Sequence, residues 1–115
     1  MMQVQQDKLD EIFKLQKSLQ DKLIKSRRYP PTIDKQVSGL CTAIIHEAVE
    51  LQRLTSWKWW KQPQPIDYQN AREELADIWH FVIDLSLALG LTPDKMVEEY
   101  KKKNLVNHQR QEKGY

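Results

Sequence analysis

The sequence predicts an all-α protein, a four-helix bundle in which residues 1–115 form a single domain. Apolar residues recur at helical spacing in four long segments, glycine is scarce, and the five prolines fall between these segments or at a first helical turn. A chain of 115 residues can bury about two thirds of its unfolded surface, which is enough for one hydrophobic core. Short connections between the helices favour antiparallel neighbours, as in a bundle.

The first two helices are predicted from apolar periodicity and from the positions of proline. The first runs over residues 5–26 and ends before Pro30 and Pro31, because proline cannot continue a helix and disfavours one just before it. The second runs over residues 34–54, and its apolar stripe includes Cys41, which we expect to be buried.

The last two helices have recognisable ends. The third is predicted over residues 67–89, with Gly90 as its C-terminal cap. Thr92 and Pro93 have the character of an N-cap followed by proline at the first helical position, so the fourth helix is predicted over residues 93–108.

Composition and charge exclude several classes of protein. A formal net charge of +2 argues against a nonspecific nucleic-acid binder, so no nucleic-acid partner is expected. Cys41 is the only cysteine, which excludes an internal disulfide and favours the reducing cytoplasm. The first residues lack the pattern of a signal peptide. The most apolar segment, residues 78–91, is too short and too polar to span a membrane, so no membrane partner is expected.

Two pairs of acidic residues indicate a metal site. Glu47 and Glu50 are three residues apart in the second predicted helix, and Glu74 and Asp77 have the same spacing in the third. Residues three apart are neighbours on a helix, so packing these helices side by side would gather four carboxylates. Burying such like charges is unfavourable unless a cation compensates them, and oxygen ligands suit Mg²⁺ or Mn²⁺.

The alternative to a metal site is a solvated surface, because acid pairs of this spacing are common in helical proteins. In that interpretation Arg53 forms an ion pair with Glu50, and Arg72 forms one with Glu73. The spacing alone does not choose between the two.

The segment 55-TSWKWWKQPQP-65 is predicted to be a loop, and it holds three tryptophans within four residues. Its indoles either cap one end of the core or form a wall that stacks on a nucleobase, with Lys58 and Lys61 binding phosphates. His80, one turn after Asp77, is either a satisfied core residue or a substrate contact.

The C-terminal segment 101–115 is basic and rich in amides. Cations suit the end of a helix, so a solvated helix terminus is the ordinary interpretation. The alternative is a flexible arm that folds over a triphosphate, in which lysine and arginine neutralise charge and asparagine adds hydrogen bonds.

In their order, these motifs resemble those of the all-α dimeric dUTPases, which belong to the MazG-like superfamily of all-α nucleoside triphosphate pyrophosphohydrolases. The matching stretches are 15-LQKSLQ-20, 47-EAVE-50, 57-WKWWK-61, 74-ELADIWHF-81 and 103-KNLVNHQRQEKGY-115. The acid pairs indicate only the superfamily, whereas the tryptophan loop and the C-terminal motif are more specific to the dUTPase branch.

The resemblance implies a homodimer that hydrolyses dUTP to the monophosphate and pyrophosphate, with water attacking the α-phosphorus. It implies Mg²⁺, with Mn²⁺ as a substitute, held by Glu47, Glu50, Glu74 and Asp77. Either Glu47 or Glu50 would be the general base, and Glu47 is preferred. The substrate-binding residues that it implies are Gln16, Trp59, Lys61, His80, Lys103, Asn107, Arg110 and Tyr115.

The sequence departs from the family pattern in ways that leave the substrate open. Gln20 stands where asparagine is usual, and the insertions of larger members are absent. One alternative is a related enzyme that acts on dCTP or on several nucleotides. The other is a non-catalytic helical module that binds a partner.

Overall fold

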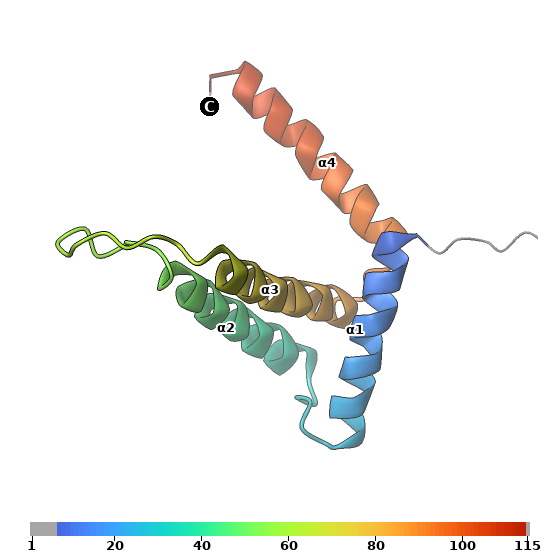
Figure 1. The fold of residues 1–115 in the computed structure, drawn as a ribbon. Coiled ribbons are helices and arrows are strands. Elements are labelled where there is room, and N and C mark those ends of the chain that lie inside the picture. The colour runs from blue at the N-terminus through green and yellow to red at the C-terminus, as the bar shows by residue number, and fades with distance from the viewer. Residues whose placement is uncertain (1–6, 115) are drawn as a thin grey trace, which may run out of the picture.

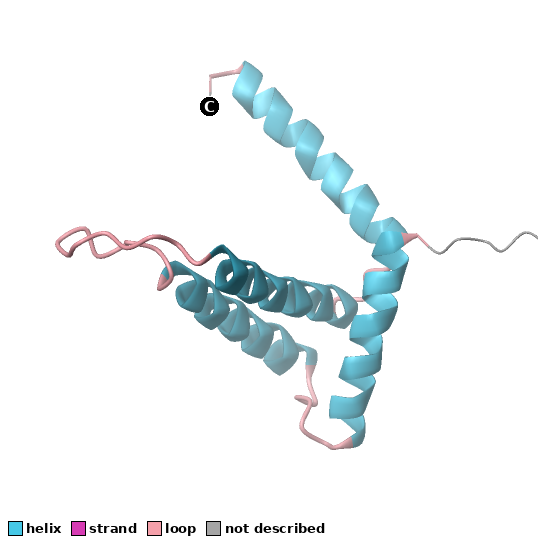
Figure 2. Cartoon of the chain, in the orientation of Figure 1, coloured by secondary structure: helices cyan, strands magenta, loops and turns pink. Residues whose placement is uncertain are grey.

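The computed structural model describes residues 7–114, and within this range the protein has four helices and no strand (Figure 1, Figure 2). The helices are α1 (Lys8–Lys25), α2 (Ile33–Gln52), α3 (Tyr68–Ala88) and α4 (Pro93–Glu112). The predicted all-α class is confirmed, and each predicted helix has an observed counterpart. The C-terminal segment differs from a flexible arm, because α4 continues as a regular helix to Glu112.

Local sequence signals set the helix ends. Each helix begins after a residue whose side chain accepts a hydrogen bond from the backbone of the first turn; these residues are Asp7, Thr32, Asp67 and Thr92. Pro93 occupies the first turn of α4, as predicted. Gly90 follows α3 with a φ of 76°, a left-handed conformation that glycine adopts without strain.

The helices form an open arrangement within one chain. α2 and α3 run antiparallel and pack along their length, and α1 crosses α3 near its C-terminal end (Figure 1). The chain bends by 103° between α3 and α4, so α4 leaves α1 and projects away from the α2–α3 pair (Figure 1). The antiparallel packing of a bundle is therefore realised in α2 and α3, while α4 stands apart.

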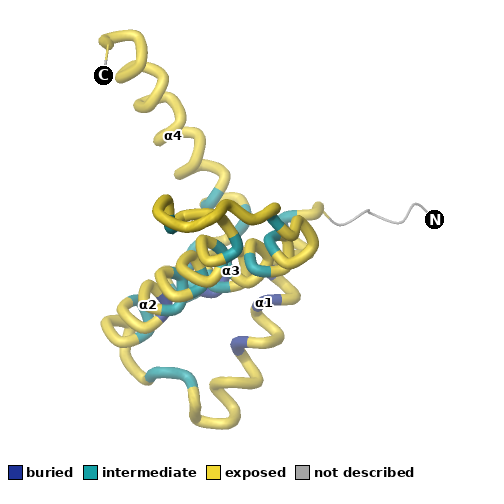
Figure 3. The backbone as a smooth tube through the Cα atoms, turned by 60° about the vertical axis from the view of Figure 1, so that its left-hand side comes forward, coloured by how far each residue is buried: buried dark blue, intermediate teal, exposed yellow. Residues whose placement is uncertain are grey.

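Few apolar side chains are buried by this arrangement. Among the described residues, the buried hydrophobic side chains are Phe13, Leu40 and Ile83, and most of the chain surface is exposed (Figure 3). Cys41 is exposed, so the prediction that it is buried is wrong. The reason is that α2 packs mainly against α3, which covers one narrow face of α2 and leaves the neighbouring positions open.

A hydrogen-bonded network in the interior fastens α1 to α3. Asp84 is 3% exposed, and its Oδ1 accepts hydrogen bonds from Gln20 Nε2 and from the Tyr29 hydroxyl, each at 2.9 Å. Gln20 also donates to the Tyr29 hydroxyl at 3.1 Å. A buried carboxylate needs such partners to be tolerated. The residue that departs from the family pattern, Gln20, thus has a structural role.

No single helix in the described range is long and apolar enough to cross a membrane. The bent pair α3–α4 reaches the required length and composition only when its two helices are taken together.

Replacing Tyr29 by phenylalanine tests the Asp84 network. Tyr29→Phe leaves Asp84 with one donor fewer, so we expect the free energy of unfolding to fall by about 1–3 kcal/mol. Urea denaturation followed by circular dichroism measures it. Tyr68→Phe, which removes a hydroxyl from an exposed side chain, is the matched control. Equal stabilities of the two variants would show that the network contributes nothing.

The same tyrosine predicts a pH dependence in alkaline solution. Burial, and then the hydrogen bond to Asp84, raise the pKa of Tyr29 from 10.0 to about 12. Below pH 10 the phenol is protonated in both folded and unfolded chains. Between pH 10 and 12 the unfolded chain loses the proton first, so the stability falls as the pH rises. Phenolate absorbance should show one tyrosine that ionises late, and Tyr29→Phe should lack both effects.

Candidate metal centre

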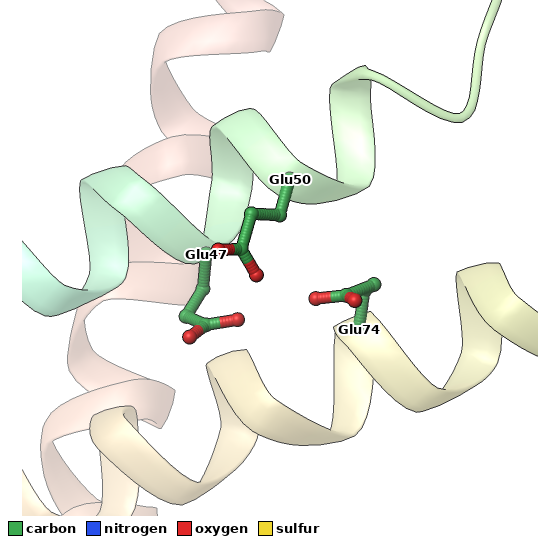
Figure 4. Close-up of side chains that lie close together, drawn as sticks. All are labelled: Glu47, Glu50 and Glu74. Carbon is green, nitrogen blue, oxygen red and sulfur yellow. The ribbon is translucent and has the colours of Figure 1, made fainter.

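The carboxylates of Glu47 and Glu50 meet that of Glu74 across the α2–α3 interface. Glu47 and Glu50 lie toward the C-terminal end of α2, and Glu74 lies toward the N-terminal end of the antiparallel α3. One carboxylate oxygen from each of these three lies within 4.8 Å of the other two, and the side chains point toward one another (Figure 4). We call these three residues the acid cluster.

The acid cluster is electrostatically uncompensated by protein groups. Burial raises the pKa of Glu47, and the charges of Glu50 and Asp77 raise it further. Burial likewise raises the pKa of Glu74, followed by the charge of Glu50. Glu47 Oε2 and Glu74 Oε2 are buried and have no hydrogen-bond partner. Buried, unpaired carboxylate oxygens are the feature that a bound cation would explain.

The ion pair that the solvated-surface alternative expected at this cluster is not formed in the described residues. Within residues 7–114 the salt bridges join Lys17 to Asp21 and Lys102 to Glu99, so Arg53 does not pair with Glu50. Oxygen-only donors of this kind suit a hard divalent cation, and three carboxylates leave room for water and for a substrate.

Asp77, the fourth predicted ligand, lies beside the acid cluster rather than within it. Its side chain is exposed, and its carboxylate is not one of the three that converge. Its negative charge nevertheless raises the pKa of both Glu47 and Glu74, so the carboxylate is close enough to interact.

Two predicted substrate-binding residues share a second pocket, between α1 and α3. Gln16 and His80 both line this pocket of about 260 Å³, together with apolar side chains such as Leu19 and Trp79. Gln16 is 7% exposed, and its Oε1 is buried without a hydrogen-bond partner. His80 is exposed rather than in the core, and its Nδ1 lies 2.8 Å from the carbonyl oxygen of Ala76.

The tryptophan loop is exposed, so its alternative role as a cap over the core is wrong. Trp59 is 86% exposed, and Trp57 and Trp60 are also exposed. The indoles stack edge to face, with ring centroids 5.5 Å apart for Trp59 and Trp60. Ser56 fastens the loop by accepting a hydrogen bond from the amide of Gln64 at 2.9 Å. The loop extends beyond the ends of α2 and α3 (Figure 1).

Lys61 belongs to a hollow on this loop. It lines a hollow of about 630 Å³ together with Arg53 and Trp57. Trp59 and Lys61 do not line the pocket of Gln16 and His80. Within a single chain, the predicted base-binding residues therefore divide between two places.

The predicted phosphate-binding residues lie on α4. Lys103, Asn107 and Arg110 are exposed and recur at positions that share one face of the helix. α4 projects away from the α2–α3 pair, so these residues are not gathered at their own acid cluster (Figure 1). Tyr115, predicted at the end of the arm, lies outside the described residues.

Sequence analysis missed an apolar cleft between α3 and α4. The cleft measures about 590 Å³, and its walls include Trp79 and Val82 from α3 and Tyr100 and Leu105 from α4. The α3 residues of the cleft lie at the spacing expected of core positions, but in the single chain they line this cleft instead.

The fold and the acid cluster together define an all-α protein that carries a carboxylate site between two antiparallel helices. A family model described as dUTPase matches residues 8–92 and 82–115, which together cover nearly the whole chain. The chain therefore belongs to the all-α dUTPase family, and this confirms the resemblance in the motifs.

One characterised relative is also similar in sequence to this chain. The chain is 28% identical over 102 residues to a dCTP pyrophosphatase of Enterobacteria phage T4, in a match that covers 77% of this chain and 60% of the relative. The chain thus spans about three fifths of the length of that relative. No solved structure matches the chain.

Neutralising one acid of the cluster should stabilise the metal-free protein. We expect Glu50→Gln to raise the unfolding temperature in EDTA by a few degrees, because it removes like-charge repulsion. Addition of Mg²⁺ should stabilise the wild-type chain more than this variant. Differential scanning fluorimetry measures both effects, with Glu98→Gln on α4 as the control. If the two variants respond alike to EDTA and Mg²⁺, the cluster is a solvated surface.

Proposed function

We propose that the protein is a nucleoside triphosphate pyrophosphohydrolase that hydrolyses dUTP to the monophosphate and pyrophosphate. The observation that carries the proposal is the convergence of Glu47, Glu50 and Glu74, with buried oxygens that have no protein partner. Membership of the dUTPase family and the likeness to a dCTP pyrophosphatase support this choice of reaction.

The acid cluster fits Mg²⁺, with Mn²⁺ as a substitute. Glu47, Glu50 and Glu74 would hold the ion, and Asp77 would complete the set from beside them. The unpartnered oxygens of Glu47 and Glu74 fit such an ion, because hard cations take carboxylate oxygens as ligands. Such an ion, when bound, activates water and neutralises charge on phosphates.

The glutamates of α2 supply the proton acceptor. Glu47 is our choice as general base, with Glu50 as the alternative. Burial and neighbouring carboxylates raise the pKa of Glu47 when no ion is bound, and a general base must lie within hydrogen-bond reach of the attacking water. Water would attack the α-phosphorus, its proton would pass to Glu47, and pyrophosphate would leave. Lys103, Asn107 and Arg110 would hold the leaving phosphates, and because α4 projects away from its own acid cluster (Figure 1) they would do so at the site of the second subunit of the predicted homodimer.

The pocket of Gln16 and His80 is our candidate for the nucleoside. The buried Gln16 Oε1 is an acceptor without a partner, and a nucleobase N–H group would satisfy it. The loop residues Trp59 and Lys61 would contribute from outside this pocket. The indole of Trp59 could enclose the nucleobase, and the ammonium group of Lys61 could bind a phosphate. For these reasons we keep both residues as substrate contacts.

dCTP is the second candidate substrate, and the name of the phage T4 relative favours it. The amide of Gln16 carries both a donor and an acceptor, so it can face either uracil or cytosine.

A homodimer, a cytoplasmic location and the lack of nucleic-acid and membrane partners remain predictions from the sequence.

A nucleotide panel tests the proposed reaction. We expect pyrophosphate release from dUTP in the presence of Mg²⁺. Glu74→Ala should lower this activity by more than about 100-fold, since even residues that only hydrogen-bond to a metal ligand contribute about 10–100-fold. Glu98→Gln should keep full activity. Release from dCTP alone would select the second candidate. If none of dUTP, dCTP, dTTP, dATP, dGTP and UTP is hydrolysed, the proposed function is wrong.

Gln16→Leu tests the nucleoside pocket. The substitution keeps the volume but removes the amide, so we expect kcat/KM for the preferred nucleotide to fall roughly 10-fold, as for one hydrogen bond. Leu15→Met, on the rim of the same pocket, is the control. An unchanged kcat/KM for Gln16→Leu would place the base elsewhere.

A further inference from the structure

The hollow on the tryptophan loop is lined by cations and by no acid. Its volume is about 630 Å³, and Arg53, Lys58 and Lys61 all line it; we call it the loop hollow. Its polar walls include Thr55 and Ser56. Residues 51–66 contain no aspartate or glutamate. The loop hollow therefore gathers positive charge beside hydroxyl groups, which is the set of side chains that binds phosphate.

Arg53 connects the loop hollow to the acid cluster. It is the C-cap residue of α2 and follows Glu50 by three residues, so the two are neighbours on the helix surface. Within residues 7–114 no salt bridge joins them, and Arg53 lines the loop hollow instead. The helix dipole favours a cation at this end of α2, which explains one basic residue. It does not explain why three cations share one hollow.

Hydrogen bonds hold the loop in a defined shape. The Ser56 hydroxyl donates to the Gln64 carbonyl oxygen at 3.2 Å and accepts from the Gln64 amide at 2.9 Å, which ties the two ends of the loop together. Between them, the Lys61 amide donates to the Lys58 carbonyl oxygen at 3.0 Å. A ligand that binds such a structured loop costs less ordering of the protein than one that binds a flexible chain.

The indole in the loop hollow already has partners within the chain. Lys58 Nζ lies over the Trp57 ring, 5.5 Å from its centroid. The Trp60 ring meets the Trp57 ring at 85°, with the centroids 6.0 Å apart. Both contacts compete with a base that would stack on Trp57. Negative charge, rather than an aromatic ring, therefore defines the ligand that fits this hollow.

The loop hollow and the nucleoside pocket lie on opposite sides of the acid cluster. Arg53 follows Glu50 toward the C-terminal end of α2, whereas His80 follows Glu74 toward the C-terminal end of α3. Because the two helices run antiparallel, these directions are opposite, and the loop lies beyond one end of the pair (Figure 1). The order along the pair is therefore pocket, acids and cations, which matches the order of base, α-phosphorus and diphosphate in a nucleotide.

We propose that the loop hollow binds inorganic pyrophosphate, the product that the proposed reaction releases beside it. Arg53, Lys58 and Lys61 would share its two phosphate groups, and the planar guanidinium of Arg53 can hold two oxygens of one phosphate. The site would add to the phosphate-binding residues of α4, which the same chain does not bring to its own acid cluster.

The identity of pyrophosphate as a product rests on the proposed function, but its binding is measured without turnover. Calorimetric titration in EDTA excludes binding through a metal ion. We expect pyrophosphate to bind more tightly than inorganic phosphate, because it reaches more of the cations. Arg53→Gln and Lys58→Gln should each weaken this binding about 10-fold, as for the loss of a charged hydrogen-bond donor.

Lys35→Gln is the matched control, because it removes one exposed lysine from the opposite end of α2. It should leave the affinity unchanged. If pyrophosphate does not bind, if inorganic phosphate binds equally well, or if the control loses as much affinity as Arg53→Gln, the proposal is overturned.

Product inhibition tests the same site in the active enzyme. Arg53→Gln should raise the inhibition constant of pyrophosphate about 10-fold, for the same physical reason, and Lys35→Gln should not change it. An unchanged inhibition constant for Arg53→Gln overturns the proposal. If wild type binds pyrophosphate through Arg53 but hydrolyses no nucleotide, the proposed function is wrong and the binding site is supported.

Discussion

The mutual repulsion of three carboxylates is the constraint on which the rest of the structure depends. The antiparallel packing of α2 on α3 holds Glu47, Glu50 and Glu74 together, although burial and neighbouring charge raise the pKa of Glu47 and that of Glu74. No described cation relieves them. The interface that gathers these acids must therefore be stabilised elsewhere, and this cost is typical of sites built for a ligand rather than for stability.

Part of that stabilisation comes from the Asp84 network at the other end of α3. Gln20 and Tyr29 satisfy the buried carboxylate of Asp84, which fixes α1 across α3. The same crossing positions Gln16 against the side of α3 that carries His80. The buried carboxylate of Asp84, through its bonds to Gln20 and Tyr29, thus orients the proposed nucleoside pocket. The unpartnered carboxylate oxygens belong instead to Glu47 on α2 and to Glu74 on α3.

Features determined by local sequence could be predicted, and features determined by packing between distant segments could not. The Thr92–Pro93 start of α4 and the neighbouring positions of Glu47 and Glu50 depend on a few adjacent residues, and the structure agrees with both. The exposure of Cys41 and of Trp59 depends on which faces find a neighbour. Apolar spacing shows that a face will be buried, but it does not show whether the same chain buries it. The direction of α4 could not be predicted for the same reason.

Over the residues that the structure describes, the single chain leaves the apolar surface of α4 without a partner and the acid cluster without a cation, and α4 bears on both. α4 carries both the apolar surface that lacks a partner and the lysines that an uncompensated acid cluster with a bound triphosphate would require. If a second copy supplies both, assembly and substrate binding become linked, because a ligand that binds only the dimer stabilises the dimer by mass action. The charge repulsion within each cluster would then be offset by the partner, the cation and the nucleotide together. A chain that is poorly packed alone would form a complete site and a closed core in the same step.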